Sequence, residues 1–320
     1  MSKIALGIDV SKLTVDVALL LETNKVKTKK FDNKSKGFVE LVEWLNKKNV
    51  QDLHVCMEAT GVYSNALATY LFDAGYRVSV VNPVQIKGFG QSELSRNKTD
   101  KADAQLIARF CRAMQPKAWQ PKPLHIRELQ DLVRRLEALQ DMYRQEHNRL
   151  EVASTQVKSS IDSVLSRLSE ELEEVKKKIA SHIKQHSDLD EKSKLLETIP
   201  GVGEATISQV LAFIGNVDDF KNAKQLAAFV GLNPKQRQSG TSVHGRSRMS
   251  KIGSSSLRKA FYMPAVSAKH HNPIVRDFCE NLKKAGKPTM LIIGAAMRKL
   301  VHIIFGVLKS GKPFNINFSK

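Results

Sequence analysis

The spacing of apolar and polar positions divides the 320-residue chain into three stretches, residues 1–115, 116–190 and 191–320. In the first stretch, short apolar and β-branched runs alternate with segments in which apolar residues recur every three or four positions, which predicts strands and helices in turn. The second stretch keeps the helical spacing throughout, and the third contains helical segments separated by glycine-containing turns. We therefore expect more than one domain.

The first stretch predicts a mixed sheet covered by helices. Strands that follow one another directly pair as antiparallel neighbours, whereas strands joined through helices pair in parallel. The resulting order, βββαβαβα, is that of an α/β, ribonuclease H-like domain. The expected strands are residues 4–9, 14–21, 26–31, 54–57 and 77–81, and the expected helices are residues 33–45, 62–72 and 101–114.

The second stretch is expected to be a linker followed by a long coiled coil. Residues 116–123 are bounded by prolines, and neither Gly nor Pro occurs between Pro123 and Pro200. Because a narrow apolar stripe needs a partner to cover it, we expect a dimerisation element, with an intramolecular helical arm as the alternative. The stripe with 3-4 spacing consists of Leu129, Leu132, Leu136, Leu139, Tyr143, Leu150, Val157, Ile161, Leu165, Leu168, Leu172, Val175 and Ile179.

The charge of the chain is large and unevenly placed. The chain carries 51 Lys and Arg against 32 Asp and Glu, a formal net charge of +19, and its pI is near 9.8. Residues 221–320 hold 19 Lys and Arg and two acids, which leaves +17 there and +2 in the first 220 residues. Such a surplus predicts a polyanionic partner, most economically nucleic acid.

Cysteine content and hydropathy argue against other classes. The three cysteines are odd in number and far apart, which speaks against a disulfide framework or a cysteine zinc site. The first residues lack the apolar core of a signal peptide. The apolar stretch 290–308 contains Arg298 and Lys299, which favours a buried or amphipathic helix over a membrane span. We expect a cytoplasmic protein without a membrane partner.

Four acidic residues stand where a ribonuclease H-like sheet would bring them together. Asp9 ends the first expected strand, and Glu58 ends the fourth. Asp100 and Asp103 share one face at the start of a helix. Converging carboxylates need a cation, and hard oxygen ligands suit Mg²⁺ or Mn²⁺. Two such ions would clamp the attacking and leaving oxygens of a phosphodiester exchange.

Each of these acids also has a plainer interpretation. Asp100 could cap the helix, Asp103 could be a favourable first-turn charge, and Asp9 could be a turn residue. Their combination, in this order of elements, favours the metal site. Asp16 and Glu93 are left out of the predicted site, because the first lies in mid-strand and the second in a polar loop.

The third stretch is expected to be mostly α-helical, with a loop suited to a phosphate backbone. Residues 231–253 are punctuated by glycine and rich in Arg, Lys and hydroxyl side chains. Upstream, residues 199–203 (Ile-Pro-Gly-Val-Gly) resemble a helix-hairpin-helix turn, in which backbone N–H groups approach a DNA phosphate. The expected phosphate contacts are Arg237, Arg246, Arg248 and Lys251.

Three motifs, in order, resemble those of the DEDD-type insertion-sequence transposases. They are Gly7-Ile8-Asp9-Val10-Ser11-Lys12, Met57-Glu58-Ala59-Thr60-Gly61 and Lys98-Thr99-Asp100-Lys101-Ala102-Asp103-Ala104. Members of that family carry a RuvC-like nuclease domain, a coiled coil and a C-terminal transposase domain, so the resemblance covers essentially the whole chain. It implies a RuvC-like domain at residues 1–115, a linker and coiled coil at 116–190, and the basic transposase domain at 191–320.

The resemblance also implies a chemistry. Family members place a catalytic serine in a Ser-Gly-x-Ser setting after a Gly-x-x-Pro stretch, which Ser239 matches here, with Ser242 as the second candidate. That serine attacks DNA to form a phosphoserine link, while Mg²⁺ at the four acids activates the phosphate. A guide (bridge) RNA pairs with donor and target DNA.

The expected function is therefore that of a site-specific DNA recombinase, which excises and inserts its own insertion sequence. We expect it to act as a homo-oligomer, a dimer or a tetramer, at the nucleoid in the cytoplasm of a bacterium or archaeon.

Two other functions stay open at this point. A structure-selective endonuclease of the Holliday-junction resolvase type would use the four carboxylates and water, without the serine. A non-enzymatic DNA- or RNA-binding protein on a degenerate nuclease fold would use neither, although four intact acids argue against it.

Overall fold

The computed structural model describes residues 4–50, 52–93, 99–239, 243–250 and 252–316. It divides into two compact units, Met1–Lys122 and Pro123–Lys320, and each is considered by itself.

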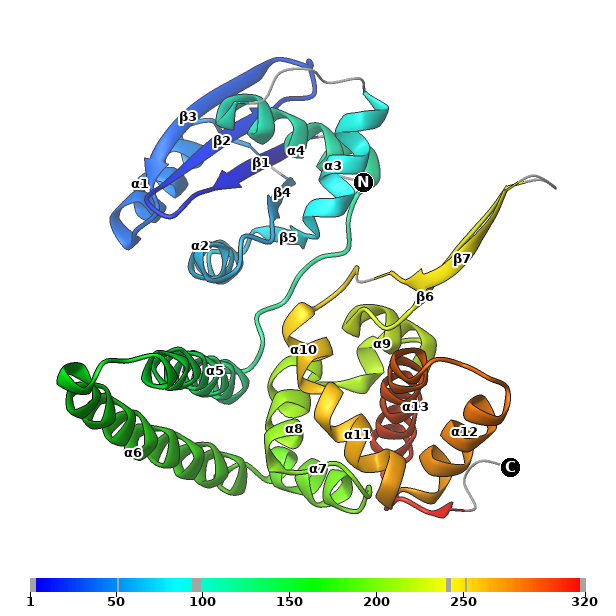
Figure 1. The fold of residues 1–320 in the computed structure, drawn as a ribbon. Helices are drawn as coiled ribbons and strands as arrows, with labels where there is room; N and C mark the ends of the chain where they lie inside the picture. Colours follow the sequence, from blue (N-terminus) through cyan, green and yellow to red (C-terminus); the bar gives the residue numbers. More distant parts are fainter. Residues whose placement is uncertain (1–3, 51, 94–98, 240–242, 251, 317–320) are drawn as a thin grey trace. The chain divides into compact units, whose positions relative to one another are not determined.

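The N-terminal unit is built on a five-stranded mixed sheet in the order β3-β2-β1-β4-β5 (Figure 1). The first three strands are antiparallel neighbours, and β1, β4 and β5 are parallel. This confirms the mixed sheet expected from the order of elements. The strands are β1 (Ile4–Val10), β2 (Thr14–Leu20), β3 (Val26–Asp32), β4 (Leu53–Glu58) and β5 (Arg77–Val81).

Helices cover both faces of this sheet. On one face, α1 (Ser35–Asn46) and α2 (Val62–Asp73) pack on alternate residues of the strands, including Leu6 and Ile8. On the other face lie α3 (Pro83–Ser92) and α4 (Asp100–Met114), which bury Ala5. Each helix thus buries its apolar stripe against one side of the pleat.

Helix α3 was not expected from the sequence. Asn82-Pro83 indicates the end of a strand, but it also starts a helix, since the Asn82 side chain accepts a hydrogen bond from the Val84 amide at 2.9 Å. Proline is favoured at the first helical position because its missing N–H is not needed there. As a result, Glu93 directly follows a helix instead of lying within a loop, and it forms an ion pair with Arg109 at 2.9 Å.

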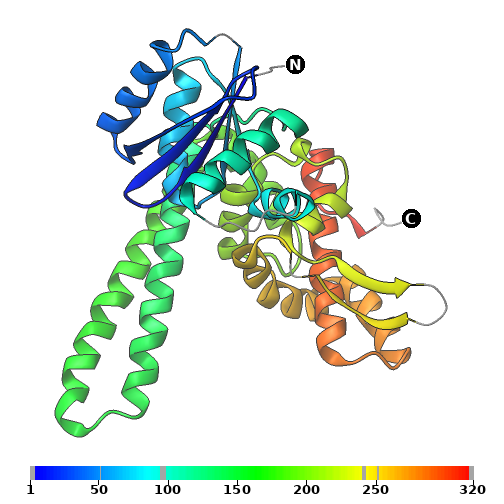
Figure 2. The same cartoon turned by 90° about the horizontal axis from the view of Figure 1, so that it is seen from above.

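The C-terminal unit begins with two long helices, α5 (Leu124–Glu151) and α6 (Thr155–Gln185), which lie side by side as a helical hairpin (Figure 2). Its apolar residues, such as Leu129, Leu136 and Ile179, join the same core as the helices that follow. The pair therefore packs within the chain.

The remaining elements form a helical bundle with one β-hairpin. In residues 231–253, the structure has two antiparallel strands where an irregular loop was expected. The elements are α7 (Ser187–Glu197), α8 (Glu204–Gln209), the π-helical turn η1 (Val210–Ile214), the 3-10 turn η2 (Val217–Asp219), α9 (Ala223–Val230), β6 (Pro234–Ser239), β7 (Val243–Met249), α10 (Ser255–Ala260), α11 (Tyr262–His271), α12 (Pro273–Lys284) and α13 (Thr289–Ser310).

Helix α13 is the one described helix long and apolar enough to cross a membrane. In this unit it is a core helix, because Leu300, Val301 and Ile304 are fully buried among the neighbouring helices. Its Arg298 donates a hydrogen bond to the Asn233 side chain at 2.8 Å. These contacts account for the apolar stretch as part of a packed bundle.

Close contact between α4 and β1 depends on Gly7. A Cβ atom at position 7 would lie 2.1 Å from the Ala104 carbonyl oxygen and 2.3 Å from the Ala108 amide nitrogen. Both neighbours are backbone atoms in the middle of a helix, so neither can move aside alone. Only glycine allows the helix to approach the strand this closely.

Replacing this glycine should displace α4. We expect Gly7→Ala to lower the free energy of unfolding of the N-terminal unit by about 3 kcal/mol, because overpacking against backbone costs at least that much. Gly88→Ala in α3 is the matched control, since a Cβ atom there meets nothing within 4 Å. Both tryptophans, Trp44 and Trp119, lie in this unit, so urea unfolding followed by their fluorescence reports on it. Equal midpoints for the two variants would contradict the close approach.

Candidate functional site: a carboxylate cluster at the edge of the sheet

Alternation along β1 assigns Asp9 to the face that α4 covers. Leu6 and Ile8 enter the core beneath α1 and α2, whereas Ala5 and Gly7 face α4. Successive side chains of a strand point to opposite faces, so Asp9 follows Ala5 and Gly7. Asp9 lies two residues beyond Gly7, the position at which α4 approaches β1 most closely.

Two neighbouring strands add carboxylates on the same face. On β2, Asp16 pairs with Asp9 in the antiparallel register. On β4, Met57 pairs with Ile8, so Glu58 is the next residue along, and it shares a face with Cys56, which packs against α4. The ends of three adjacent strands thus carry acids at one edge of the sheet.

The first turn of α4 contributes two more acids. Thr99 is the N-cap, and its hydroxyl oxygen accepts a hydrogen bond from the Ala102 amide at 3.2 Å. Asp100 and Asp103 therefore do not cap the helix themselves. Because Ala104 lies over Gly7, the first turn of the helix extends toward Asp9.

The electrostatics of Asp9 show that these acids gather. Burial, followed by the negative charges of Asp103, Asp100, Glu58 and Asp16, raises the pKa of Asp9 from 3.8 to about 6. Burial and like charges both disfavour the ionised form. The other three acids of the predicted site, together with Asp16, therefore lie within electrostatic range of Asp9.

One lysine partly offsets this negative charge. Lys30 on β3 lies 3.0 Å from the Asp16 carboxylate and 4.0 Å from that of Asp100. The hydrogen bond with Asp16 is the main cause that raises the pKa of Lys30. The Lys30 side chain is 54% exposed, so this cation can move away from the cluster.

The donor set suits a hard divalent cation. The cluster offers carboxylate oxygens only, which is the ligand type of Mg²⁺ and Mn²⁺, and it has more negative charge than Lys30 neutralises. Within the described residues, no three His, Cys, Asp or Glu side chains already stand at the spacing of a formed metal centre. The residues fit such an ion in charge and chemistry.

The predicted phosphate-binding and nucleophilic residues belong to the β6–β7 hairpin. Ser239 is the last residue of β6 and pairs with Val243, and Arg237 pairs with Gly245, so Arg246 is the next residue on β7. Arg248 is exposed and pairs with Lys235. Ser242 and Lys251 lie outside the described residues.

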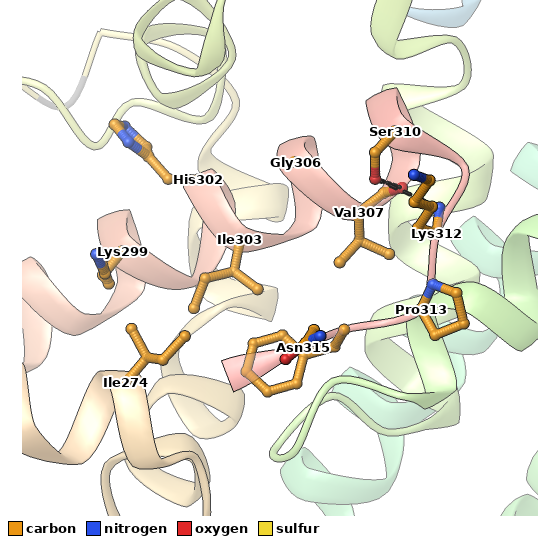
Figure 3. A pocket seen from close by; sticks show the side chains of 11 residues that line it. Ile274, Lys299, His302, Ile303, Gly306, Val307, Ser310, Lys312, Pro313 and Asn315 are labelled. Atoms are coloured by element: carbon orange, nitrogen blue, oxygen red, sulfur yellow. Dashed lines mark hydrogen bonds between the residues drawn. The ribbon is translucent and has the colours of Figure 1, made fainter. Parts of the chain in front are cut away.

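The C-terminal unit contains cavities of its own, and none of these acids lines the one in Figure 3. That cavity, of about 240 Å³, lies between α12, α13 and the segment that follows α13. Ile274, Ile303 and Val307 form part of its wall, and its lining contains Lys299 and His302 but no Asp or Glu. Burial and nearby cations lower the pKa of His302. This cavity has no carboxylate pair and no activated hydroxyl, so it is not a candidate for phosphodiester chemistry.

Asp16 is the residue that the sequence analysis missed. It was set aside as a mid-strand acid, yet it lies opposite Asp9 and contributes to the raised pKa of that residue. The signal lay in the short turn between β1 and β2. When a hairpin closes with Val10 opposite Val15, Asp9 must face Asp16.

The pKa of Asp9 predicts how stability depends on pH. Since the folded chain holds this proton up to about pH 6 and the unfolded chain only to about pH 4, stability falls as the pH rises through this window. Without divalent ions, Asp9→Asn should therefore be more stable than the parent at neutral pH, by on the order of 1–2 kcal/mol after discounting for solvent screening. The advantage should vanish near pH 4, where Asp9 is protonated.

Urea unfolding at the two pH values, followed by tryptophan fluorescence, measures this difference. Glu40→Gln, at an exposed position on α1, is the control and should change stability at neither pH. An advantage of Asp9→Asn that is equal at both pH values would show that packing, and not charge, causes it.

Comparison with known proteins agrees with this geometry. Residues 6–158 match the IS110-type DEDD transposase family, and residues 193–280 match the transposase IS116/IS110/IS902 family. The pilin gene-inverting protein of Moraxella lacunata is 36% identical over 318 residues, which covers 98% of each chain. The protein of the same name from Moraxella bovis matches equally. A 43.6 kDa protein of insertion element IS110 from Streptomyces coelicolor is 29% identical over 119 residues, 37% of this chain and 29% of that protein.

These matches confirm the family expected from the three motifs, and they include both units of the structure. Two relatives match at 36% identity over 98% of the chain, which is enough to assign the family. The chain belongs to the IS116/IS110/IS902 family of transposases, and it is a DNA transposase or recombinase.

Proposed function

We propose that this recombinase excises and inserts its own mobile element by Mg²⁺-dependent strand cleavage and exchange, with Ser239 as the nucleophile. The observation that carries the proposal is the convergence of four acids on Asp9, whose pKa is raised to about 6 by burial first and by their negative charges second. A fold without catalytic use for these acids would gain stability by losing them. Their convergence supports a site that holds cations and phosphate.

Asp9, Glu58, Asp100 and Asp103 would hold the Mg²⁺, or Mn²⁺ in its place. When bound, the ion supplies charge stabilisation at the scissile phosphate. Asp16 adds negative charge beside Asp9, and Lys30 holds Asp16 and Asp100 in place until the cluster is filled. Close packing of α4 on Gly7 keeps the two helical acids over the strand ends.

Ser239 would attack phosphorus through its hydroxyl oxygen. A bond forms between this oxygen and phosphorus, and the bond from phosphorus to the leaving oxygen of the DNA strand breaks. Serine is a weak nucleophile unless a base takes its proton, and the carboxylate of Asp103 is the base we assign. Because Ser239 belongs to the C-terminal unit and the acids to the N-terminal unit, the reaction requires the two to meet, within one chain or between subunits.

Assembly into a dimer or tetramer would use the helical hairpin of α5 and α6. Several apolar side chains toward its far end are exposed in the chain, which supports a role as a coiled-coil contact between copies. They are Met142 (42% exposed), Val152 (87%), Val157 (47%) and Val164 (44%).

The C-terminal unit would hold DNA and a guide RNA encoded by the element. Its surplus of +17 over residues 221–320 supports many phosphate contacts, for which we assign Arg237, Arg246, Arg248 and Lys251. Sequence recognition would then come from base pairing with the RNA. The protein would work in the cytoplasm, at the nucleoid.

DNA inversion is a second candidate function. Two relatives that match this chain over 98% of its length are named pilin gene-inverting proteins. Inversion and excision use the same cleavage and exchange, and they differ in the relative orientation of the two sites. Sequencing the junctions formed when the gene and its native flanking DNA are expressed together distinguishes the two.

The catalytic assignments predict a specific pair of defects. Asp103→Asn and Ser239→Ala should each reduce strand exchange at least about a hundredfold, because the first removes a ligand and base and the second removes the nucleophile. Neither should change affinity for DNA. The assay follows labelled DNA carrying the element ends on a denaturing gel, where a covalent protein–DNA adduct is retarded.

Ser250→Ala is the control, since that hydroxyl oxygen accepts a hydrogen bond from the Ile252 amide at 3.4 Å and lies outside the assigned site. An adduct that persists in Ser239→Ala would exclude this serine as nucleophile. Cleavage by Ser239→Ala without any adduct would favour the water-dependent nuclease instead.

The proposal of a guide RNA predicts that the purified protein contains one defined nucleic acid. Sequencing of the RNA that copurifies with the chain, expressed from its native locus, should give one homogeneous species that maps beside the gene. Heterogeneous cellular RNA in the same experiment would indicate general phosphate binding and would contradict the guide RNA.

A further inference from the structure

A hollow of about 670 Å³ lies at the base of the β6–β7 hairpin, in the C-terminal unit. It shares no lining residue with the carboxylate cluster or with the cavity of Figure 3. It is formed where the end of β7 meets α10, α11 and α13, and its lining residues are Met249, Ser255, Arg258, Lys259, Tyr262, Met263, Met290, Ile293, Gly294 and Met297.

Methionine dominates this hollow. Four of the eight methionines of the chain line it, and they come from three elements: Met249 from β7, Met263 from α11, and Met290 and Met297 from α13. Methionine has a flexible, polarisable side chain, and clusters of exposed methionines are used by surfaces that adapt to their ligands. A cluster from separate parts of the sequence cannot result from the apolar stripe of one helix.

The hollow is open to solvent above an apolar floor. Met263 and Met290 are each 67% exposed, and Tyr262 is 38% exposed, whereas Met297 and Ile293 are 5% and 9% exposed. Gly294 leaves room in the floor of the hollow, because a Cβ atom at position 294 would approach the Met249 methyl group to 3.0 Å. An exposed apolar patch of this kind marks a binding surface.

Its surroundings select an anionic ligand. The lining residues include Arg258 and Lys259 and no acid, and they lie within the hundred residues that carry +17. The Lys259 ammonium group lies 3.3 Å from the Asp141 carboxylate of α5, which offsets part of its charge, and the lining residues still carry a positive surplus. A ligand with a flat apolar part and a negative charge beside it matches this arrangement, and an unpaired nucleotide has both.

The position in the hairpin favours a DNA strand. Met249 pairs with Pro234 at the base of the hairpin, and Ser239 pairs with Val243 at its other end. Ser239 lies five residues along β6 from Pro234, which is roughly 17 Å at the rise of a β-strand. A DNA strand whose phosphate reaches Ser239 can therefore place a nearby base at the hollow. Apolar side chains also contact the methyl group of thymine, which uracil lacks.

We infer that the methionine hollow between β7, α10, α11 and α13 receives an unpaired base of the DNA strand undergoing exchange. The methionines and Tyr262 contact the base, and Arg258 and Lys259 face its phosphate. This inference rests on the proposed function, because it needs a DNA strand at the hairpin that carries Ser239.

Methyl NMR on the full-length protein, labelled with ¹³C at the methionine methyl groups, tests the inference. Three probes of about ten nucleotides are added in turn: oligothymidylate, oligouridylate, and an abasic DNA strand of equal length. Bases that stack on a methyl group shift its signal upfield through their ring current. We expect oligothymidylate to shift the Met263 and Met290 signals, the abasic strand to leave them in place, and the signal of Met114, at the end of α4, to stay unchanged with every probe.

Affinity provides the second readout. The double variant Met263→Ala/Met290→Ala should bind oligothymidylate about tenfold more weakly, in line with the loss of a base contact, and should bind the abasic strand like the parent. Met114→Ala is the matched control, since it removes an exposed methionine that has no part in the hollow or in the proposed contact between copies.

Four results would overturn the inference. Methionine signals that stay in place while oligothymidylate binds tightly would exclude the hollow and leave the proposed function intact. Equal shifts with the abasic strand would assign the contact to phosphate alone, and larger shifts with oligouridylate would assign the hollow to RNA. Shifts that depend on protein concentration without any nucleic acid would show that a second copy of the chain occupies it. Failure of every probe to bind would count against the proposed function itself.

Discussion

The contact between α4 and β1 at Gly7 is the constraint on which the candidate site depends. A helix can bring acids over the end of a strand only if its backbone lies close to that strand, and any side chain at position 7 prevents this. The close contact places Asp100 and Asp103 near Asp9, where burial first and the like charges second raise the pKa of Asp9. Packing of Ala104 and Ala108 against the sheet thus offsets the repulsion between these carboxylates.

The two units divide the electrostatics of the chain. The N-terminal unit holds 19 Lys and Arg against 12 Asp and Glu, a net +7, yet it gathers negative charge at one edge of its sheet, whereas residues 221–320 of the C-terminal unit carry +17. A polyanion is attracted to the second unit and repelled by the bare edge of the first. Cations at that edge would reverse the repulsion locally, which makes metal binding and substrate binding mutually supportive.

Much of the N-terminal unit follows from residue patterns alone. Alternation around Ile4, Leu6 and Ile8 defines β1, and the order of strands and helices defines the mixed sheet. The approach of Asp9 to Asp103 can be expected from strand ends and a helix start, although their catalytic roles stay proposals. Asp16 was misjudged, because its place in mid-strand says nothing about its partner across the hairpin.

The C-terminal unit was harder to anticipate for physical reasons. Residues 234–249 lack the apolar alternation of a buried strand, so the β6–β7 hairpin is not visible in the pattern. In the N-terminal unit, helix α3 was missed because Asn82-Pro83 ends a strand and starts a helix at once. The methionine hollow has no signal along the chain, since its members meet only in the folded bundle.

The division of the chain at Lys122 and Pro123 has a consequence for the cell that carries it. On the proposed mechanism, neither unit can carry out strand exchange by itself. The N-terminal unit holds the acids but no nucleophile, and the C-terminal unit holds the serine hydroxyl without the carboxylates that activate it. A nascent, clipped or unassembled protein is then harmless to the chromosome. The two-unit architecture itself then prevents unintended strand exchange, without a separate inhibitor.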